Sequence, residues 1–188
     1  MKKAHYNPKS LRWFISLIIM LVIGVAVVFG SSALKKLADA KYNTPVDVDF
    51  TVAQAVPMSV EENDFNVTSV EKALDAQGNT VAYVIKSSQV GYNAEVPIEL
   101  ETTITADGSV VCSVDVLKQE ETEYLGVRIE TDDFKNQFKG RKLPIVSSNS
   151  IEKGAKVDVI AKSTISSQAV IDGVNNATNY LNTFILEK

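Results

Sequence analysis

The chain has 188 residues, of which 45% are hydrophobic and 22% are charged, and it contains one cysteine and one histidine. This composition excludes a disordered protein, a small disulfide-stapled domain, and a metal site with cysteine and histidine ligands. The net charge of −4 divides unevenly: residues 1–45 carry seven bases and one acid, and residues 46–188 carry twelve bases and 22 acids. The acidic remainder argues against binding of nucleic acid, because phosphate contacts need clustered Lys and Arg.

An uncharged apolar run extends from Trp13 to Phe29. With a rise of about 1.5 Å per residue, a helix of this length and its flanks can cross a hydrocarbon core of about 30 Å. We therefore expect a basic cytoplasmic N-terminus over residues 1–12 and a single transmembrane helix over residues 13–30. A cleaved signal peptide is the alternative, since small residues follow at 31–33, although the run is longer than the usual apolar region of about 7–15 residues.

The basic N-terminus also predicts the orientation of the chain. Four Lys or Arg within the first twelve residues favour a cytoplasmic N-terminus, so the remainder should be extracytoplasmic, at the inner or plasma membrane. Residues 31–57 are expected to form a helical extension and a linker, with a helix break at Asn43 to Pro45. Residues 58–188 would then form one extracytoplasmic domain of ordinary size.

Past Pro57 the pattern changes to short alternating runs separated by turn residues, which predicts β-strands. One strand is expected around Val81 to Ile85 and another over residues 95–104. The sequence Thr105 to Gly108 (TADG) predicts a hairpin turn, because Asp and Gly tolerate positive φ. The following strand, residues 109–117, places Cys112 on an apolar face, where we expect an inert thiol.

Two helices follow the expected strands. A short helix should begin at Asp132 and end at Gly140. A longer helix is expected from about Ser167 toward Leu186, with Ser166 or Ser167 as its N-cap. Its apolar stripe has spacings of 4, 3, 4 and 3 and consists of Val170, Val174, Ala177, Leu181 and Phe184. The predicted fold class is α+β, with an antiparallel sheet covered by the C-terminal helix.

The usual catalytic groups are missing from the expected domain. His5 precedes the apolar run, so Cys112 has no histidine partner, and no glycine-rich phosphate loop occurs. The carboxylates Glu120, Glu121 and Glu123 could form an acid and base pair, but a solvated acidic turn is the simpler interpretation. An autonomous hydrolase is therefore not expected.

A hydroxyl-rich segment, Asp158 to Val170 (DVIAKSTISSQAV), leads into the long helix. The free N–H groups and the positive end of the helix dipole should converge near residues 164–167 and could hold a phosphate. The alternative is that these hydroxyls only cap the helix.

This segment resembles the closing motif of the FMN-binding domain found in the G subunit of Rnf electron-transport complexes and the C subunit of sodium-translocating NADH:quinone reductase. The family's Asp, Ser/Thr-Gly-Ala/Ser-Thr and following helix correspond to Asp158, residues 161–164 and the long helix. The upstream turn Glu-Thr-Pro-Gly-Leu-Gly appears as residues 121–126 (ETEYLG), followed by the family-like residues 134–140 (FKNQFKG), and residues 88–92 (SQVGY) resemble the strand before the central hairpin.

The resemblance implies specific binding residues. Thr164 would carry FMN through a phosphoester, Ser163 and Ser166 would neighbour the phosphate, and Thr122, Leu125 and Gly126 would surround the ring. Two departures from the motifs matter: Lys162 replaces a glycine, and Glu123-Tyr124 replaces the Pro-Gly of the upstream turn. Lys162 would be strained at positive φ or would place an ammonium near the phosphate, and Tyr124 would crowd the ring or stack on it.

The resemblance also implies a role: an electron-transfer subunit of an ion-translocating oxidoreductase complex, rather than an autonomous enzyme. Its expected partners are the membrane, other subunits of the complex, and a flavin transferase that loads FMN from FAD. A flavin-free, membrane-tethered assembly or binding module is the alternative, favoured by the two departures. A generic lipid- or peptide-binding domain is a third possibility, but no large apolar groove can be inferred from the sequence.

Overall fold

The computed structural model describes residue 20 and residues 40–187. The basic N-terminus and nearly all of the expected transmembrane segment lie outside these residues, so the anchor and its orientation stay predictions. Among the residues that are described, no helix combines the length and the apolar character needed to cross a membrane. The chain divides into two compact units, residues 1–40 and 41–188, and the description below concerns the second.

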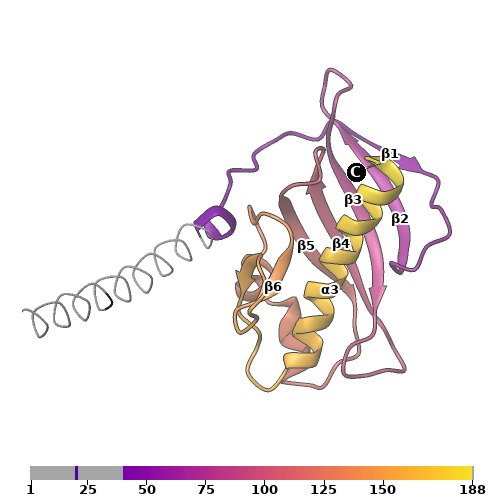
Figure 1. The fold of residues 1–188 in the computed structure, drawn as a ribbon. Helices are drawn as coiled ribbons and strands as arrows, with labels where there is room; N and C mark the ends of the chain where they lie inside the picture. Colours follow the sequence, from indigo (N-terminus) through magenta and orange to yellow (C-terminus); the bar gives the residue numbers. More distant parts are fainter. Residues whose placement is uncertain (1–19, 21–39, 188) are drawn as a thin grey trace, which may run out of the picture. The chain divides into compact units, whose positions relative to one another are not determined.

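Five strands form one antiparallel sheet in the order in which they occur along the chain (Figure 1). The strands are β1 (Gln54–Met58), β2 (Val67–Leu74), β3 (Thr80–Gln89), β4 (Ile98–Thr105) and β5 (Val111–Lys118). In β3 the side chains of Tyr83, Ile85, Ser87 and Gln89 alternate with less buried residues, as expected for a strand with one covered face. The predicted α+β domain with an antiparallel sheet is therefore confirmed.

The predicted hairpin between β4 and β5 is present. Gly108 adopts φ +72°, and the carboxylate of Asp107 accepts hydrogen bonds from the Thr105 hydroxyl at 2.6 Å and the Ser109 N–H at 3.1 Å. Cys112 follows in β5 and is 7% exposed. Burial raises the pKa of its thiol to about 11, with a smaller contribution from the charge of Asp107, so the thiol is neutral at physiological pH.

Several elements differ from the expectations. β1 starts at Gln54, before Pro57, and pairs with β2 along its whole length. A short parallel pair, β6 (Ile145–Ser147) and β7 (Ala155–Val157), and the 3-10 helix η1 (Gly126–Glu130) were not expected. Elements of three to five residues are too short to produce a recognisable hydrophobic period.

The long helix α3 (Thr164–Tyr180) crosses one face of the sheet and continues as a π-helical turn, η2 (Leu181–Ile185) (Figure 1). The apolar stripe is buried as predicted up to Leu181, whereas Phe184 is 39% exposed and packs against Phe65 and Tyr180. The predicted start near Ser167 and the predicted N-cap, Ser166 or Ser167, are wrong. The cap is Ser163, because Ser166 and Ser167 lie within the first turn and their hydroxyls bond to groups outside the helix.

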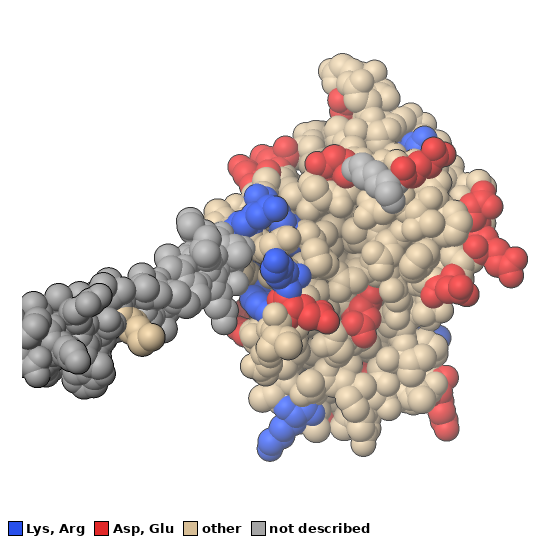
Figure 2. All heavy atoms as spheres, viewed as in Figure 1, with Lys and Arg blue, Asp and Glu red and all other residues tan. Residues whose placement is uncertain are grey.

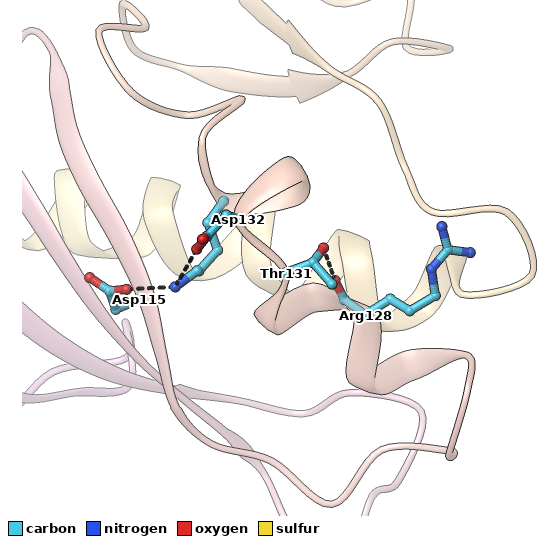
Figure 3. A network of polar contacts seen from close by, with 5 residues as sticks. Asp115, Arg128, Thr131 and Asp132 are labelled. Carbon is cyan, nitrogen blue, oxygen red and sulfur yellow. Dashed lines mark hydrogen bonds and ion pairs between the residues drawn. The ribbon is translucent and has the colours of Figure 1, made fainter.

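The short helix α2 (Asp132–Lys135) begins where expected but ends at Lys135, so the predicted end at Gly140 is wrong. Phe134 and Phe138 are buried in edge-to-face contact, and Gly140 has φ +71° after the helical turn. The Lys135 ammonium lies 2.9 Å from Asp115 and 3.6 Å from Asp132, and the Thr131 hydroxyl donates to the carbonyl of Arg128. Figure 3 shows Asp115, Arg128, Thr131 and Asp132 beside this helix. The bond to Asp115 raises the pKa of Lys135.

The segment that precedes β1 is bound to the rest of the domain. The Asn43 carbonyl accepts a hydrogen bond from the Arg141 guanidinium at 2.6 Å, and the Asn43 side chain accepts the Lys156 N–H at 2.7 Å. The Val46 N–H donates to the carbonyl of Gly140. Figure 2 shows Asp and Glu side chains spread over the viewed face of the domain, in keeping with its acidic composition.

Candidate functional site

A pocket of about 380 Å³ lies at the N-terminal end of α3. Three segments line it: Tyr92 after β3; Thr122, Leu125 and Gly126 ahead of and at the start of η1; and residues 162–166 around the start of α3. Its volume falls in the range of about 300–1,000 Å³ that is typical of small-molecule sites.

Seven of the eight candidate binding residues predicted from the sequence lie in the lining of this pocket. The seven that line the pocket are Thr122, Leu125, Gly126, Lys162, Ser163, Thr164 and Ser166. Tyr124 does not belong to the lining, and its side chain is 80% exposed. Sequence reasoning missed Tyr92, although it ends the family-like stretch 88–92, and Ile165, which gave no signal because it resembles any apolar residue of an amphipathic helix.

Two turns beside the pocket hold non-glycine residues in the left-handed conformation. Tyr124 has φ +60° in a turn closed by the Leu125 N–H donating to the Thr122 carbonyl, and Lys162 has φ +66° in a turn closed by the Ser163 N–H donating to the Ile160 carbonyl. These are the two positions at which the resembled motifs carry glycine. The expected strain at Lys162 is therefore present, because a side chain in this conformation costs about 1–2 kcal/mol.

The start of α3 offers unused donors to the pocket. Thr164 is the first helical residue and is exposed, while Ser163 is 6% exposed and makes no side-chain capping bond. The Ser163 hydroxyl is buried without a hydrogen-bond partner, and N–H groups of a first helical turn have no carbonyl within the helix to bond. The sequence left open the alternative that the hydroxyls of this segment only cap the helix. The Ser163 hydroxyl does not fit that alternative, because it makes no capping hydrogen bond.

Glu121 is buried behind the pocket wall, at 6% exposure. Its carboxylate accepts hydrogen bonds from the N–H groups of Tyr92 and Asn93, each at 3.1 Å, and from the Ser166 hydroxyl at 2.5 Å. Glu120 and Glu123 are exposed. The simple interpretation as a solvated acidic turn therefore holds for these two residues and fails for Glu121.

Gly126 lies where the pocket wall approaches the Glu121 side chain. A Cβ atom added at Gly126 would meet the Glu121 Cβ at 2.5 Å and the Ser166 Oγ at 3.0 Å. Only glycine therefore fits at this point of the wall without displacing its neighbours. Within residues 40–187 and residue 20, no group of three or more His, Cys, Asp or Glu residues could hold a metal ion.

Residues 91–179, which include all three segments of the pocket, match the FMN-binding domain family. This part of the chain is therefore similar to the family, and the resemblance inferred from the motifs is confirmed. The G subunit of the ion-translocating oxidoreductase complex of Methanosarcina acetivorans is 37% identical over 123 residues, which are 65% of this chain and 63% of that relative. The match thus spans less than two thirds of that relative's length.

Two solved structures share the fold. The C subunit of the Na⁺-translocating NADH-quinone reductase of Parabacteroides distasonis superposes with a TM-score of 0.54 at 21% identity, covering 71% of this chain and 77% of that one. NqrC of Shewanella oneidensis gives a TM-score of 0.55 at 16% identity, covering 75% and 73%. At these identities the likeness concerns the fold alone.

Proposed function

We propose that this protein is a membrane-anchored electron-transfer subunit that binds FMN, linked through a phosphoester to Thr164, within an ion-translocating oxidoreductase complex. The observation that carries the proposal is the position of Thr164, exposed at the start of α3 in a pocket of small-molecule size. The match to the FMN-binding domain family and the relative from Methanosarcina, a G subunit of such a complex, support the same interpretation.

The phosphate side of the pocket fits a bound anion. The N–H groups of the first turn of α3 and the positive end of its dipole face the pocket beside the unpartnered Ser163 hydroxyl. The Lys162 side chain lines the same wall and can add a positive charge. These groups would hold a phosphate on Thr164 with hydrogen bonds that the protein alone leaves unused.

The ring side of the pocket combines apolar contacts with few polar groups. Tyr92, Leu125 and Ile165 supply apolar surface, and Thr122 supplies a hydroxyl. Bound FMN supplies the electron-accepting chemistry, whereas the protein supplies position and burial. Gly126 lets the pocket wall pack closely against Glu121, and the lining residues would orient the ring and exclude water from one side of it.

The membrane anchor and the partners belong to this proposal. An anchor over residues 13–30 would keep the domain beside its electron donor and acceptor and raise their effective concentration. A flavin transferase would join the Thr164 oxygen to the FMN phosphate of FAD, with AMP as the leaving group. A covalent link would retain the flavin in an extracytoplasmic compartment, where a lost cofactor could not be replaced from the cytoplasm.

A flavin-free assembly or binding module is the second candidate. The observation that favours it is the pair of non-glycine residues, Tyr124 and Lys162, held at positive φ where the motif carries glycine. Tyr124 lies outside the pocket lining, whereas Lys162 is part of it.

Covalent flavin separates the two candidates. The full chain is co-expressed with a flavin transferase and purified, and flavin fluorescence is measured in the denatured protein band. We expect a fluorescent band for the wild type and for Thr68→Val, which changes an exposed threonine outside the pocket, and a dark band for Thr164→Val. A dark wild type with proven transferase activity would favour the flavin-free module, and fluorescence that survives Thr164→Val would place the link on another residue.

A further inference from the structure

Glu121 joins the separate segments that line the pocket. Its two carboxylate oxygens accept the backbone N–H groups of residues 92 and 93, which follow β3, and its Oε2 accepts the hydroxyl of Ser166 in the first turn of α3. Glu121 itself precedes Thr122, which lines the pocket. One side chain therefore fixes the relative positions of three chain segments.

The space around this carboxylate is shaped for it by two glycines. A Cβ atom at Gly126 would lie 3.0 Å from Oε2, and a Cβ atom at Gly91 would collide with Oε1. Both glycines are buried. The close fit means that the carboxylate cannot turn toward solvent without displacing the pocket wall.

The charge of Glu121 is compensated by hydrogen-bond donors and not by a cation. Within the part of the chain that the structure describes, the ion pairs involve Glu99, Glu101, Asp115 and Asp132, and none involves Glu121. Two of its three donors are backbone N–H groups, which can only donate. A charge that is buried in this way acts over a longer range than an exposed one, because solvent screens it little.

We propose that Glu121 is a positioning residue for the flavin pocket and that its fixed negative charge lowers the reduction potential of the bound FMN. This inference rests on the proposed function. Reduction adds negative charge to the ring, and an anion held directly behind Gly126 and Ser166 opposes that change. The carrier would therefore donate electrons more readily than the same pocket with a neutral residue at position 121.

Two variants change the charge and its compensation in opposite directions. Glu121→Gln keeps the size of the side chain and removes the charge, so the potential of the loaded protein should rise. Ser166→Ala keeps the charge and removes the shortest hydrogen bond to it, so the potential should fall. Glu120→Gln is the matched control, because it removes the same charge from the adjacent exposed residue and should leave the potential unchanged.

The test is a redox titration of the full-length, flavin-loaded proteins, together with their thermal unfolding. For Glu121→Gln we expect at least a tenfold change in the ratio of reduced to oxidised flavin at a fixed potential, which is about 30 mV for a two-electron couple. We also expect a lower unfolding temperature than for Glu120→Gln, because the partly buried N–H groups of residues 92 and 93 lose a charged acceptor.

The outcomes are distinct from those that test the proposed function. A loaded Glu121→Gln protein with the potential of the Glu120→Gln control overturns the inference while leaving the flavin carrier intact. If Glu121→Gln does not load, Ser166→Ala decides, and an unshifted or raised potential in that variant overturns the inference. If neither loads although Glu120→Gln does, the residues have a structural role only and the electrostatic claim is wrong. A wild type without flavin removes the proposed function and this inference together.

Discussion

Replacing Lys162 with glycine should stabilise the domain, although the change shortens an exposed side chain and adds backbone freedom. Lys162 has φ +66°, a conformation that costs a residue with a side chain about 1–2 kcal/mol and costs glycine almost nothing. Glycine gives the unfolded chain additional freedom, worth about 0.4–1 kcal/mol. The difference leaves a gain of up to about 1.5 kcal/mol in the free energy of unfolding for Lys162→Gly.

The matched control is Lys153→Gly. Lys153 is also exposed and lies in a loop, but it is not among the described residues with positive φ. Its replacement removes the same charge and adds the same freedom without relieving strain, so it should cost about 0.4–1 kcal/mol. Denaturant unfolding of the full-length protein, followed by far-ultraviolet circular dichroism, measures both. Equal losses of stability in the two variants would refute the argument from backbone strain.

Two further predictions concern the pocket wall and the sheet. Gly126→Ala should lower the free energy of unfolding by about 1–3 kcal/mol and reduce covalent flavin loading, because the added Cβ would lie 2.5 Å from the Glu121 Cβ. Denaturant unfolding measures the first effect and in-gel flavin fluorescence the second. Wild-type values in both assays would contradict the crowding at this position. Cys112 should not react with a thiol reagent at pH 8 until the domain unfolds, because burial raises its pKa to about 11 and keeps the thiolate fraction low. Rapid labelling of the folded protein would contradict this prediction, since it would show that the thiol is accessible.

The sequence predicted those parts of the fold that have a regular period or a characteristic turn. The alternation in β3, the TADG hairpin and the apolar stripe of α3 each depend on a local pattern that the packed domain preserves. β6 and β7 were not predicted because three residues cannot show a period, and most of β1 precedes the alternating pattern, which begins after Pro57.

The candidate site was predicted by a different route. Its residues lie on three segments far apart in the sequence, and the motif resemblance identified most of them together. The local sequence could not predict which side chains are buried and which chain segments they contact in the folded domain. Glu121 carries the same chemical signal as Glu120 and Glu123, and only the packing of residues 91–93 and α3 against it distinguishes a buried hydrogen-bond acceptor from a solvated acid. The N-cap was misplaced for the same reason, since Ser166 and Ser167 bond to Glu121 and Ile160.

The order of the strands has a consequence for when a cofactor could be attached. Each strand of the sheet pairs with its neighbour along the chain, so the sheet can assemble progressively during synthesis. Thr164 and the other pocket residues at the start of α3 are synthesised after every strand. A modifying enzyme that recognises the finished pocket would therefore meet a domain that has already folded, and flavin loading would report on completed folding as well as on cofactor supply.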